Sequence, residues 1–274
     1  AAQKNVWRRR MTRHLPLLLL ICLSSLGWTE PAAGFRWGIG PDVCYRDYEE
    51  LLLYAEKSNE QGVIYGIQSS VDSVRPCTTY YGMDVFCGYG HVNYLGAILN
   101  QNSAEVTSYT GKTSSVFKRV EGRLGWTFGL TERCWLTPFV GLGFFFWERG
   151  QVAHIPSDYA EYHRWLDGSF GLRAEVWTDC WGFELQAKAM PMHEGKMRTS
   201  FMDIEFNLGN KWHYEVAAPI TYLTERYFWT FDGIRFTPYW RRQDVGQSDL
   251  QGIWYEPASQ SWTAGLRLEA FALL

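Results

Sequence analysis

The residues of this chain that could transfer protons are histidines with aspartates near them in the sequence. An acid beside a histidine can activate water or a hydroxyl group, which is the chemistry of a hydrolase. These candidates share no recognisable motif: His91, His154, His163, His193, His213, Asp158, Asp167 and Asp203. Gly141 and Gly143 form no nucleotide-binding loop, because no helical pattern follows them. We therefore predict no catalytic residue, no cofactor and no metal ligand.

A larger set of charged residues alternates with apolar residues along the chain. In a β-strand this alternation places the charges on one face. If these faces line one interior, nine acidic residues meet eight basic ones there. Unpaired charges in a narrow interior are costly, so this near-balance predicts a network of ion pairs and hydrogen bonds. The predicted interior residues are Asp42, Arg46, Asp72, Asp84, Arg119, Glu121, Arg123, Asp167, Arg173, Glu175, Glu184, Lys188, Glu215, Arg235, Arg241, Arg267 and Glu269.

The stretch from Leu136 to Trp147 shows the alternation most clearly. Leu142 and Phe144 fall on one phase of a two-residue period, and Gly141 and Gly143 fall on the other. The same period recurs in about ten segments. Short and long connections alternate between these segments. The predicted segments are 36–48, 63–71, 80–94, 116–128, 136–147, 166–176, 181–189, 212–222, 234–241 and 262–269.

Segments joined in this way are typical of an all-β fold, a ten-stranded antiparallel transmembrane up-and-down β-barrel with short periplasmic turns and long extracellular loops. The even number of segments puts both chain ends on the side of the short turns. Pro41, Pro138, Pro219 and Pro238 weaken this prediction, because proline removes a ladder hydrogen bond. A soluble β-sandwich or a lipocalin-like barrel is the alternative, but five long loops are not expected there.

The N-terminal region has the pattern of a secretory signal peptide. Basic residues precede an apolar run from Leu15 to Leu23, and small residues follow as far as Gly34. We predict an N-terminal extension and signal peptide over 1–34 and an outer-membrane barrel over 35–274. Nothing after the apolar run supplies the roughly 20 continuous apolar residues of a membrane-spanning helix. A net charge of −3 gives no basic surface for nucleic acid.

Aromatic residues make up 17% of the chain and include 14 tryptophans. A barrel uses such residues as girdles at both membrane interfaces. The expected periplasmic girdle contains Trp126, Trp177, Trp181 and Tyr222, and the expected outer girdle contains Trp147, Trp165, Trp212 and Trp240. Between the girdles, the phase that faces lipid is expected to hold Leu124, Leu142, Phe170, Leu185 and Leu266.

Cysteine positions give a test of strand register. Cys134 and Cys180 lie near short turns of neighbouring predicted strands, and the pairing predicted for these strands sets Cys134 opposite about residues 175–178. A Cys134–Cys180 disulfide, a bond from Cys134 to Cys77, and reduced thiols all stay open, with reduced thiols favoured.

The stretch 49–57 could form a short amphipathic helix or a packed loop.

Several loose motifs resemble a family of uncharacterised Gram-negative outer-membrane β-barrel proteins. The matching segments are Gly62–Gly66, Gly90–Tyr94, Leu136–Gly143, Glu194–Asp203 and Thr237–Trp240. The resemblance implies the ten-stranded fold and an outer-membrane location, and it brings no catalytic residue. Such chains usually end in an aromatic assembly signal, whereas this chain ends Phe271-Ala-Leu-Leu. Phe271 is therefore the candidate for recognition by the barrel-assembly machinery.

The expected width of the barrel limits the function. Ten strands enclose little more space than the eight whose interior side chains can fill. We therefore expect a structural outer-membrane protein with a filled interior, or a narrow, gated channel for small solutes. The alternatives are a barrel enzyme with a protease or lipid-modifying site at its rim, and a binding module that uses its long loops. The expected partners are outer-membrane lipid, including lipopolysaccharide, and the assembly machinery.

Overall fold

The structure is a computed structural model that describes residues 34–51, 58–73, 78–99, 106–152, 159–178, 180–200, 204–224, 231–252 and 254–274. The predicted signal peptide and most of the predicted helix over 49–57 lie outside these ranges. The strands are β1 Phe35–Glu50, β2 Ser58–Ser73, β3 Thr79–Leu99, β4 Val106–Trp126, β5 Phe128–Thr131, β6 Cys134–Arg149, β7 Glu161–Trp177, β8 Trp181–Thr199, β9 Glu205–Asn207, β10 Trp212–Ala217, β11 Ile220–Leu223, β12 Gly233–Val245 and β13 Ser259–Leu273. No helix in the described ranges is long and apolar enough to cross a membrane.

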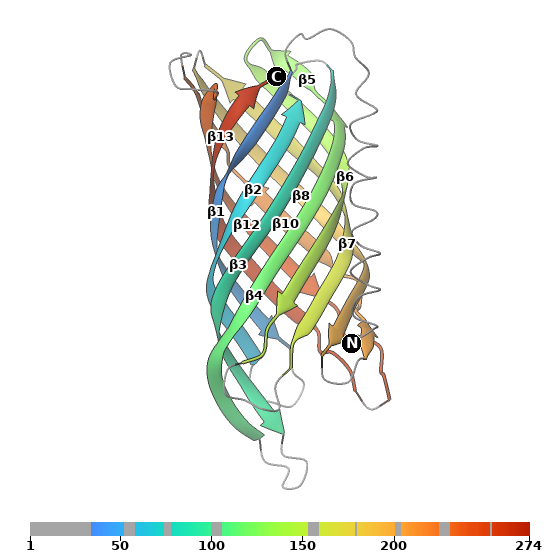
Figure 1. The fold of residues 1–274 in the computed structure, drawn as a ribbon. Helices are drawn as coiled ribbons and strands as arrows, with labels where there is room; N and C mark the ends of the chain where they lie inside the picture. The colour runs from blue at the N-terminus through green and yellow to red at the C-terminus, as the bar shows by residue number, and fades with distance from the viewer. Residues whose placement is uncertain are drawn as a thin grey trace, which may run out of the picture. The chain divides into compact units, whose positions relative to one another are not determined.

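The strands form one closed antiparallel barrel (Figure 1). β5 continues the line of β4 along β6, and β10 and β11 share one position between β8 and β12. The wall therefore has ten strands, and β9 is a short addition to β8. β13 pairs with β12 on one side and with β1 on the other, which closes the ring. The fold class predicted from the sequence is confirmed.

A proline divides one position of the wall. Pro219 lies between β10 and β11, where its missing N–H interrupts the ladder. The backbone is held across the break, because the N–H of Glu184 donates to the carbonyl of Pro219 at 2.9 Å and the N–H of Ala218 donates to that of Pro238 at 3.0 Å. Pro41 and Pro138 lie within β1 and β6 without dividing them.

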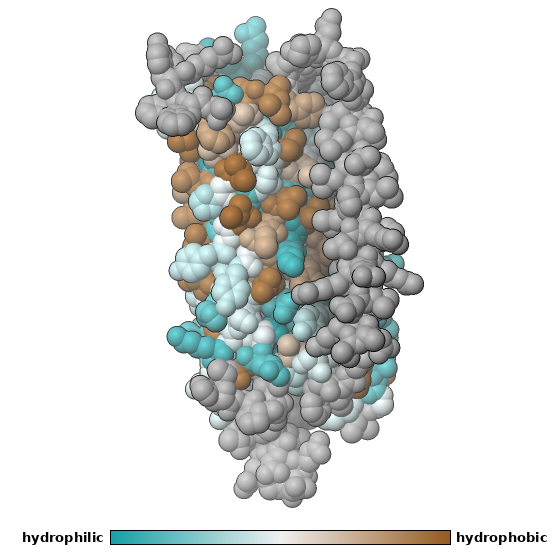
Figure 2. Space-filling view, in the orientation of Figure 1, coloured by the Kyte–Doolittle hydropathy of each residue, from teal (hydrophilic) through white to brown (hydrophobic). Residues whose placement is uncertain are grey.

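Alternation along the strands separates two chemically different faces. All five apolar residues expected to face lipid are exposed on the outer wall, and Leu142 has the most exposed side chain of them, at 73%. Figure 2 shows apolar side chains gathered on one face of the wall, with hydrophilic ones concentrated toward one end. A wall of this kind is stable only where a medium other than water covers it, as in a lipid bilayer.

The two ends of the barrel differ, and we name them by their connections. The turn end carries short connections such as 132–133 and both ends of the barrel domain, where the N–H of Leu274 donates to the carbonyl of Phe35 at 2.8 Å (Figure 1). The loop end carries the longest connections, such as 150–160 and 246–258. β3 and β4 project beyond their neighbours there. The long connection predicted between segments 80–94 and 116–128 is wrong in its bounds, because β3 continues to Leu99 and β4 begins at Val106. The connection predicted between segments 181–189 and 212–222 likewise contains the end of β8 and all of β9.

The predicted periplasmic girdle lies at the turn end. Trp126, Trp181 and Tyr222 are exposed there, and the rings of the last two lie 4.7 Å apart. Trp177 is half-buried beside Trp135, with ring centroids 6.3 Å apart. At the loop end Trp212 and Trp240 are exposed on the outer wall, as expected.

Two residues of the predicted outer girdle lie on the other face. Trp147 and Trp165 are 2% and 3% exposed and point into the barrel. Both fall on the inward phase of their strands, with Phe145 and Asp167 respectively. Their assignment to the outer girdle was wrong because position near a strand end was weighed above strand phase.

Cysteine geometry agrees with the predicted register. Cys134 pairs across the sheet with Val176, inside the expected window of 175–178. The thiols of Cys44, Cys87, Cys134 and Cys180 are all free, and Cys77 lies outside the described ranges. The Cys134–Cys180 bond is therefore not formed.

Candidate functional site

The structure places all the predicted interior residues on the inner face of the wall. All but Arg123 are buried as whole residues, and the side chain of Arg123 is only 7% exposed. Most of their partners come from strands that are distant in the sequence. All but Arg46 and Asp167 form two groups along the barrel axis, which we call the turn-end cluster and the central cluster.

Asp72 is the centre of the turn-end cluster. Its carboxylate lies 2.8 Å from a terminal nitrogen of Arg36, 3.2 Å from one of Arg173 and 3.4 Å from one of Arg235. Glu184 joins two of these guanidinium groups, at 3.0 Å from Arg173 and 2.7 Å from Arg235. Arg173 also pairs with Glu175 at 2.7 Å. Five strands thus meet through one set of alternating charges.

Glu215 has the same role in the central cluster. Its carboxylate pairs with Arg119 at 3.2 Å and with Lys188 at 3.5 Å, and it also pairs with Arg241. Lys188 in turn pairs with Glu121.

Two further pairs complete the central cluster. Arg123 lies 2.6 Å from Asp84, and Arg267 lies 3.0 Å from Asp42. The hydroxyl of Tyr239 donates to Asp42 at 2.8 Å. Near the turn end, Ser70 donates to Glu269 at 2.6 Å.

These clusters leave little empty space around them. The cavities lined by residues of the two clusters have volumes of about 10, 20 and 30 Å³. A single water needs roughly 10–15 Å³ of such volume. Each of these cavities has room for no more than one or two waters, which is too little for a hydrated ion.

An aromatic layer lies between the central cluster and the loop end. Phe117, Phe145, Trp147 and Trp165 are buried inside the barrel, with stacked ring pairs at 5.9 Å for Phe117 and Trp147 and at 4.3 Å for Phe145 and Trp165. The guanidinium of Arg46 lies 4.0 Å from the ring centre of Trp147, a cation–π contact. These aromatic side chains therefore fill the barrel interior on the loop-end side of the two ion-pair clusters.

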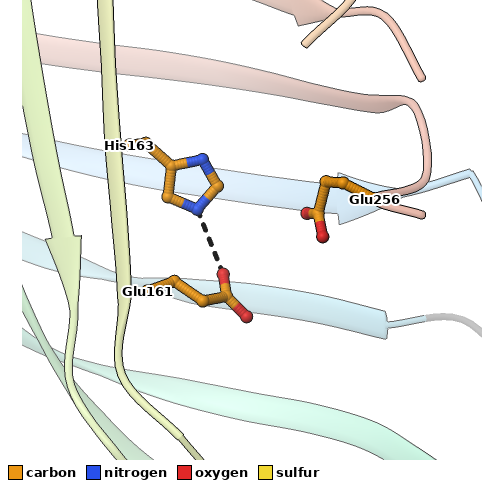
Figure 3. Close-up of side chains that lie close together, drawn as sticks. All are labelled: Glu161, His163 and Glu256. Carbon is orange, nitrogen blue, oxygen red and sulfur yellow. Dashed lines mark hydrogen bonds and ion pairs between the residues drawn. The ribbon is translucent and has the colours of Figure 1, made fainter. Parts of the chain in front are cut away.

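A third group, which we call the loop-end cluster, consists of Glu161, His163 and Glu256 (Figure 3). Glu161 and His163 are two residues apart on β7 and therefore share its inner face, and Glu256 comes from the connection between β12 and β13. Nε2 of His163 lies 3.1 Å from Oε2 of Glu161. One ligand atom from each of the three residues lies within 4.8 Å of the others, and all three residues are buried.

Negative charge is in excess around the loop-end cluster. Arg149 pairs with Oε1 of Glu161 and lies 2.7 Å from Glu60, while Glu50 adds a further carboxylate within electrostatic range. The carboxylate of Glu256 has no hydrogen bond or ion pair with any residue that the structure describes. Burial, and then repulsion from Glu161 and Glu50, hold the pKa of Glu256 well above its ordinary value.

The other candidate histidines are not brought into this cluster. His213 is fully buried, with Nδ1 3.1 Å from Asp167, and the indole of Trp165 donates to the same carboxylate at 3.1 Å. His91 and His193 are exposed. His154, Asp158 and Asp203 lie outside the described ranges.

Sequence reasoning missed both acids of the loop-end cluster, because it placed them in long polar loops. The available signal for Glu161 was its spacing of two from His163, which puts both on one face of a strand. Glu256 gave no comparable signal, because it follows no strand period.

The fold is similar to that of a solved outer-membrane barrel. The outer membrane protease OmpT from Escherichia coli is similar with a TM-score of 0.60, over 89% of this chain and 97% of that chain, at 8% identity. The translocator domain of the autotransporter NalP from Neisseria meningitidis has a TM-score of 0.41, over 97% of each chain at 7% identity. The P. putida toluene transporter TodX has a TM-score of 0.34, over 88% and 90% of the chains at 10% identity. No family model matches the chain, and no curated protein matches its sequence.

At such low identity the likeness to OmpT establishes the fold and transfers no residue role. The closed antiparallel wall, its apolar outer face and its charged interior together define an outer-membrane β-barrel protein.

Proposed function

We propose that this protein is a non-conducting outer-membrane barrel, a rigid scaffold that holds its loop end at the cell surface. The observation that carries the proposal is the filled interior, in which two ion-pair clusters and an aromatic layer follow one another along the axis. Cavities lined by these groups have volumes of about 10 to 30 Å³. Solute passage would require several buried ion pairs to separate at once, which is energetically costly.

Planar-bilayer recording of the purified, folded protein tests this proposal. We expect no step conductance, because no open path crosses the clusters. A sixteen-stranded porin, whose interior is an aqueous channel, serves as the positive control in the same bilayer. Reproducible single-channel steps from the wild-type protein would overturn the proposal and favour a narrow solute channel.

A rim enzyme is the second candidate function, and a single observation favours it. His163 is held by Glu161 at 3.1 Å, the kind of acid–histidine pair that can activate water, and it lies at the loop end. OmpT, which shares the fold, is a protease. The discriminating experiment is hydrolysis of a fluorogenic peptide library: turnover that His163→Ala abolishes and His193→Ala retains supports the enzyme, and absence of turnover supports the scaffold alone.

A further inference from the structure

We propose that the loop-end cluster is a binding site for one divalent transition-metal ion, with Glu161, His163 and Glu256 as its protein ligands. Nothing in the scaffold function requires these three side chains to converge. They come from two separate parts of the chain, and their ligand atoms lie within 4.8 Å of one another (Figure 3).

The spacing of the first two ligands fits a shared ion. Two atoms that each lie about 2.0–2.2 Å from a metal, at angles near those of tetrahedral or octahedral coordination, are roughly 3 Å apart. Nε2 of His163 and Oε2 of Glu161 are 3.1 Å apart. Arg149 occupies the other oxygen of Glu161, so the oxygen that faces the histidine is the one left to bind an ion.

Glu256 supplies an independent observation. Its side chain is directed toward Glu161 and His163 in Figure 3, and the residue is only 8% exposed. Among the residues that the structure describes, none forms a hydrogen bond or an ion pair with this carboxylate. A largely buried carboxylate is more stable beside a cation, and an ion at the centre of the cluster adds to the attraction that Arg149 supplies.

The surroundings prepare the histidine for coordination. The ring of His163 stacks on Trp147, with centroids 4.3 Å apart and planes inclined by 23°, which fixes its orientation. In metal sites generally, the residues around a ligand hold it in the orientation that binds the ion.

The donor set indicates the class of metal. Calcium and magnesium prefer oxygen ligands alone, whereas one imidazole with two carboxylates suits zinc or manganese. Zinc is the stronger binder of the two in the general affinity order. We therefore infer a first-row transition ion and choose Zn²⁺ as the probe.

Calorimetric titration of the folded full-length protein in detergent, with free thiols alkylated and metals first removed by chelation, tests the site. We expect one Zn²⁺ per chain. His163→Gln and Glu256→Gln should each weaken binding about 100-fold or more, since even the loss of an outer partner of a metal ligand costs roughly 10–100-fold.

Matched variants separate this site from surface binding. His193→Gln removes an exposed histidine, and Glu205→Gln removes an acid that pairs with Arg164 and Lys196 at the same end; both should bind Zn²⁺ as the wild type does. Glu256→Gln keeps the side-chain shape and lies outside the strands, so circular dichroism should show an unchanged barrel. A wild-type protein that binds no Zn²⁺, or a Glu256→Gln variant that binds as tightly as the wild type, overturns the proposal.

Discussion

At the scale of single residues, the interior is organised around carboxylates that each hold several basic groups. Asp72 contacts three arginines, and Glu215 contacts three arginines and a lysine. Losing one such acid leaves several buried cations facing one another, just as losing Arg173 would leave three buried carboxylates without their shared partner.

Asp72→Asn tests how much the turn-end cluster contributes to stability. We expect it to lower the free energy of unfolding by about 3–5 kcal/mol, the cost of leaving buried charges uncompensated. Urea unfolding of the refolded protein in lipid vesicles gives the measurement. Asp249→Asn, at an exposed position, should change stability by no more than about 0.5 kcal/mol. Equal effects of the two substitutions would show that the turn-end cluster contributes little.

The outer face offers a second test at this scale, because the penalty for a lipid-facing charge depends on depth. Leu142 lies midway along β6 and is 73% exposed, while Leu130 lies in β5 at the turn end and is 63% exposed. Leu142→Arg should cost about 2–4 kcal/mol of unfolding free energy, and Leu130→Arg about 0–1 kcal/mol. The same unfolding assay measures both, and a larger cost at Leu130 than at Leu142 would contradict the placement of the membrane.

At the scale of elements, the two-residue period predicted which face of a strand points outward more reliably than the sequence predicted where a strand ends. The two-residue period identified the outward face of β4, β6, β7, β8 and β13, because a slip by one residue would turn every charge toward lipid. The ends of β3, β4 and β8 were misjudged, since beyond the membrane a strand can continue with polar residues on both faces.

The register between β6 and β7 yields a prediction about chemical crosslinking. Cys134 and Val176 are direct cross-strand partners. Such partners have Cα atoms about 4.5–5.5 Å apart, within the range that a disulfide spans. We expect Val176→Cys to form a disulfide with Cys134 on mild oxidation of the folded protein, and mass spectrometry of the digested protein detects it. The wild type is the control, and a Cys134–Cys180 bond formed in its place would show that the register is shifted.

At the scale of the whole molecule, the sequence predicted many of the residues that enter the interior, though not Arg36, Arg149 or Glu161, and it did not predict which of them meet. Arg235 and Asp72 are 163 positions apart and pair only because strand tilt brings β12 and β2 to the same height. Tilt and stagger are properties of the closed ring, so no single segment encodes them. The loop-end cluster was missed for the same reason, since Glu256 reaches its neighbours through a connection and not through a strand pattern.

The pairing of the first strand with the last has a consequence for how the barrel forms. β1 and β13 adjoin along most of their length, although nearly the whole domain separates them in sequence. The entropic cost of closing a loop grows with its length, so this pairing is expected to be among the last contacts made. Until then both strands are unpaired edges, and each can capture a strand from another chain. Slow pairing of β1 with β13 therefore favours aggregation. A chain that lacks β13 would carry two unpaired edges permanently.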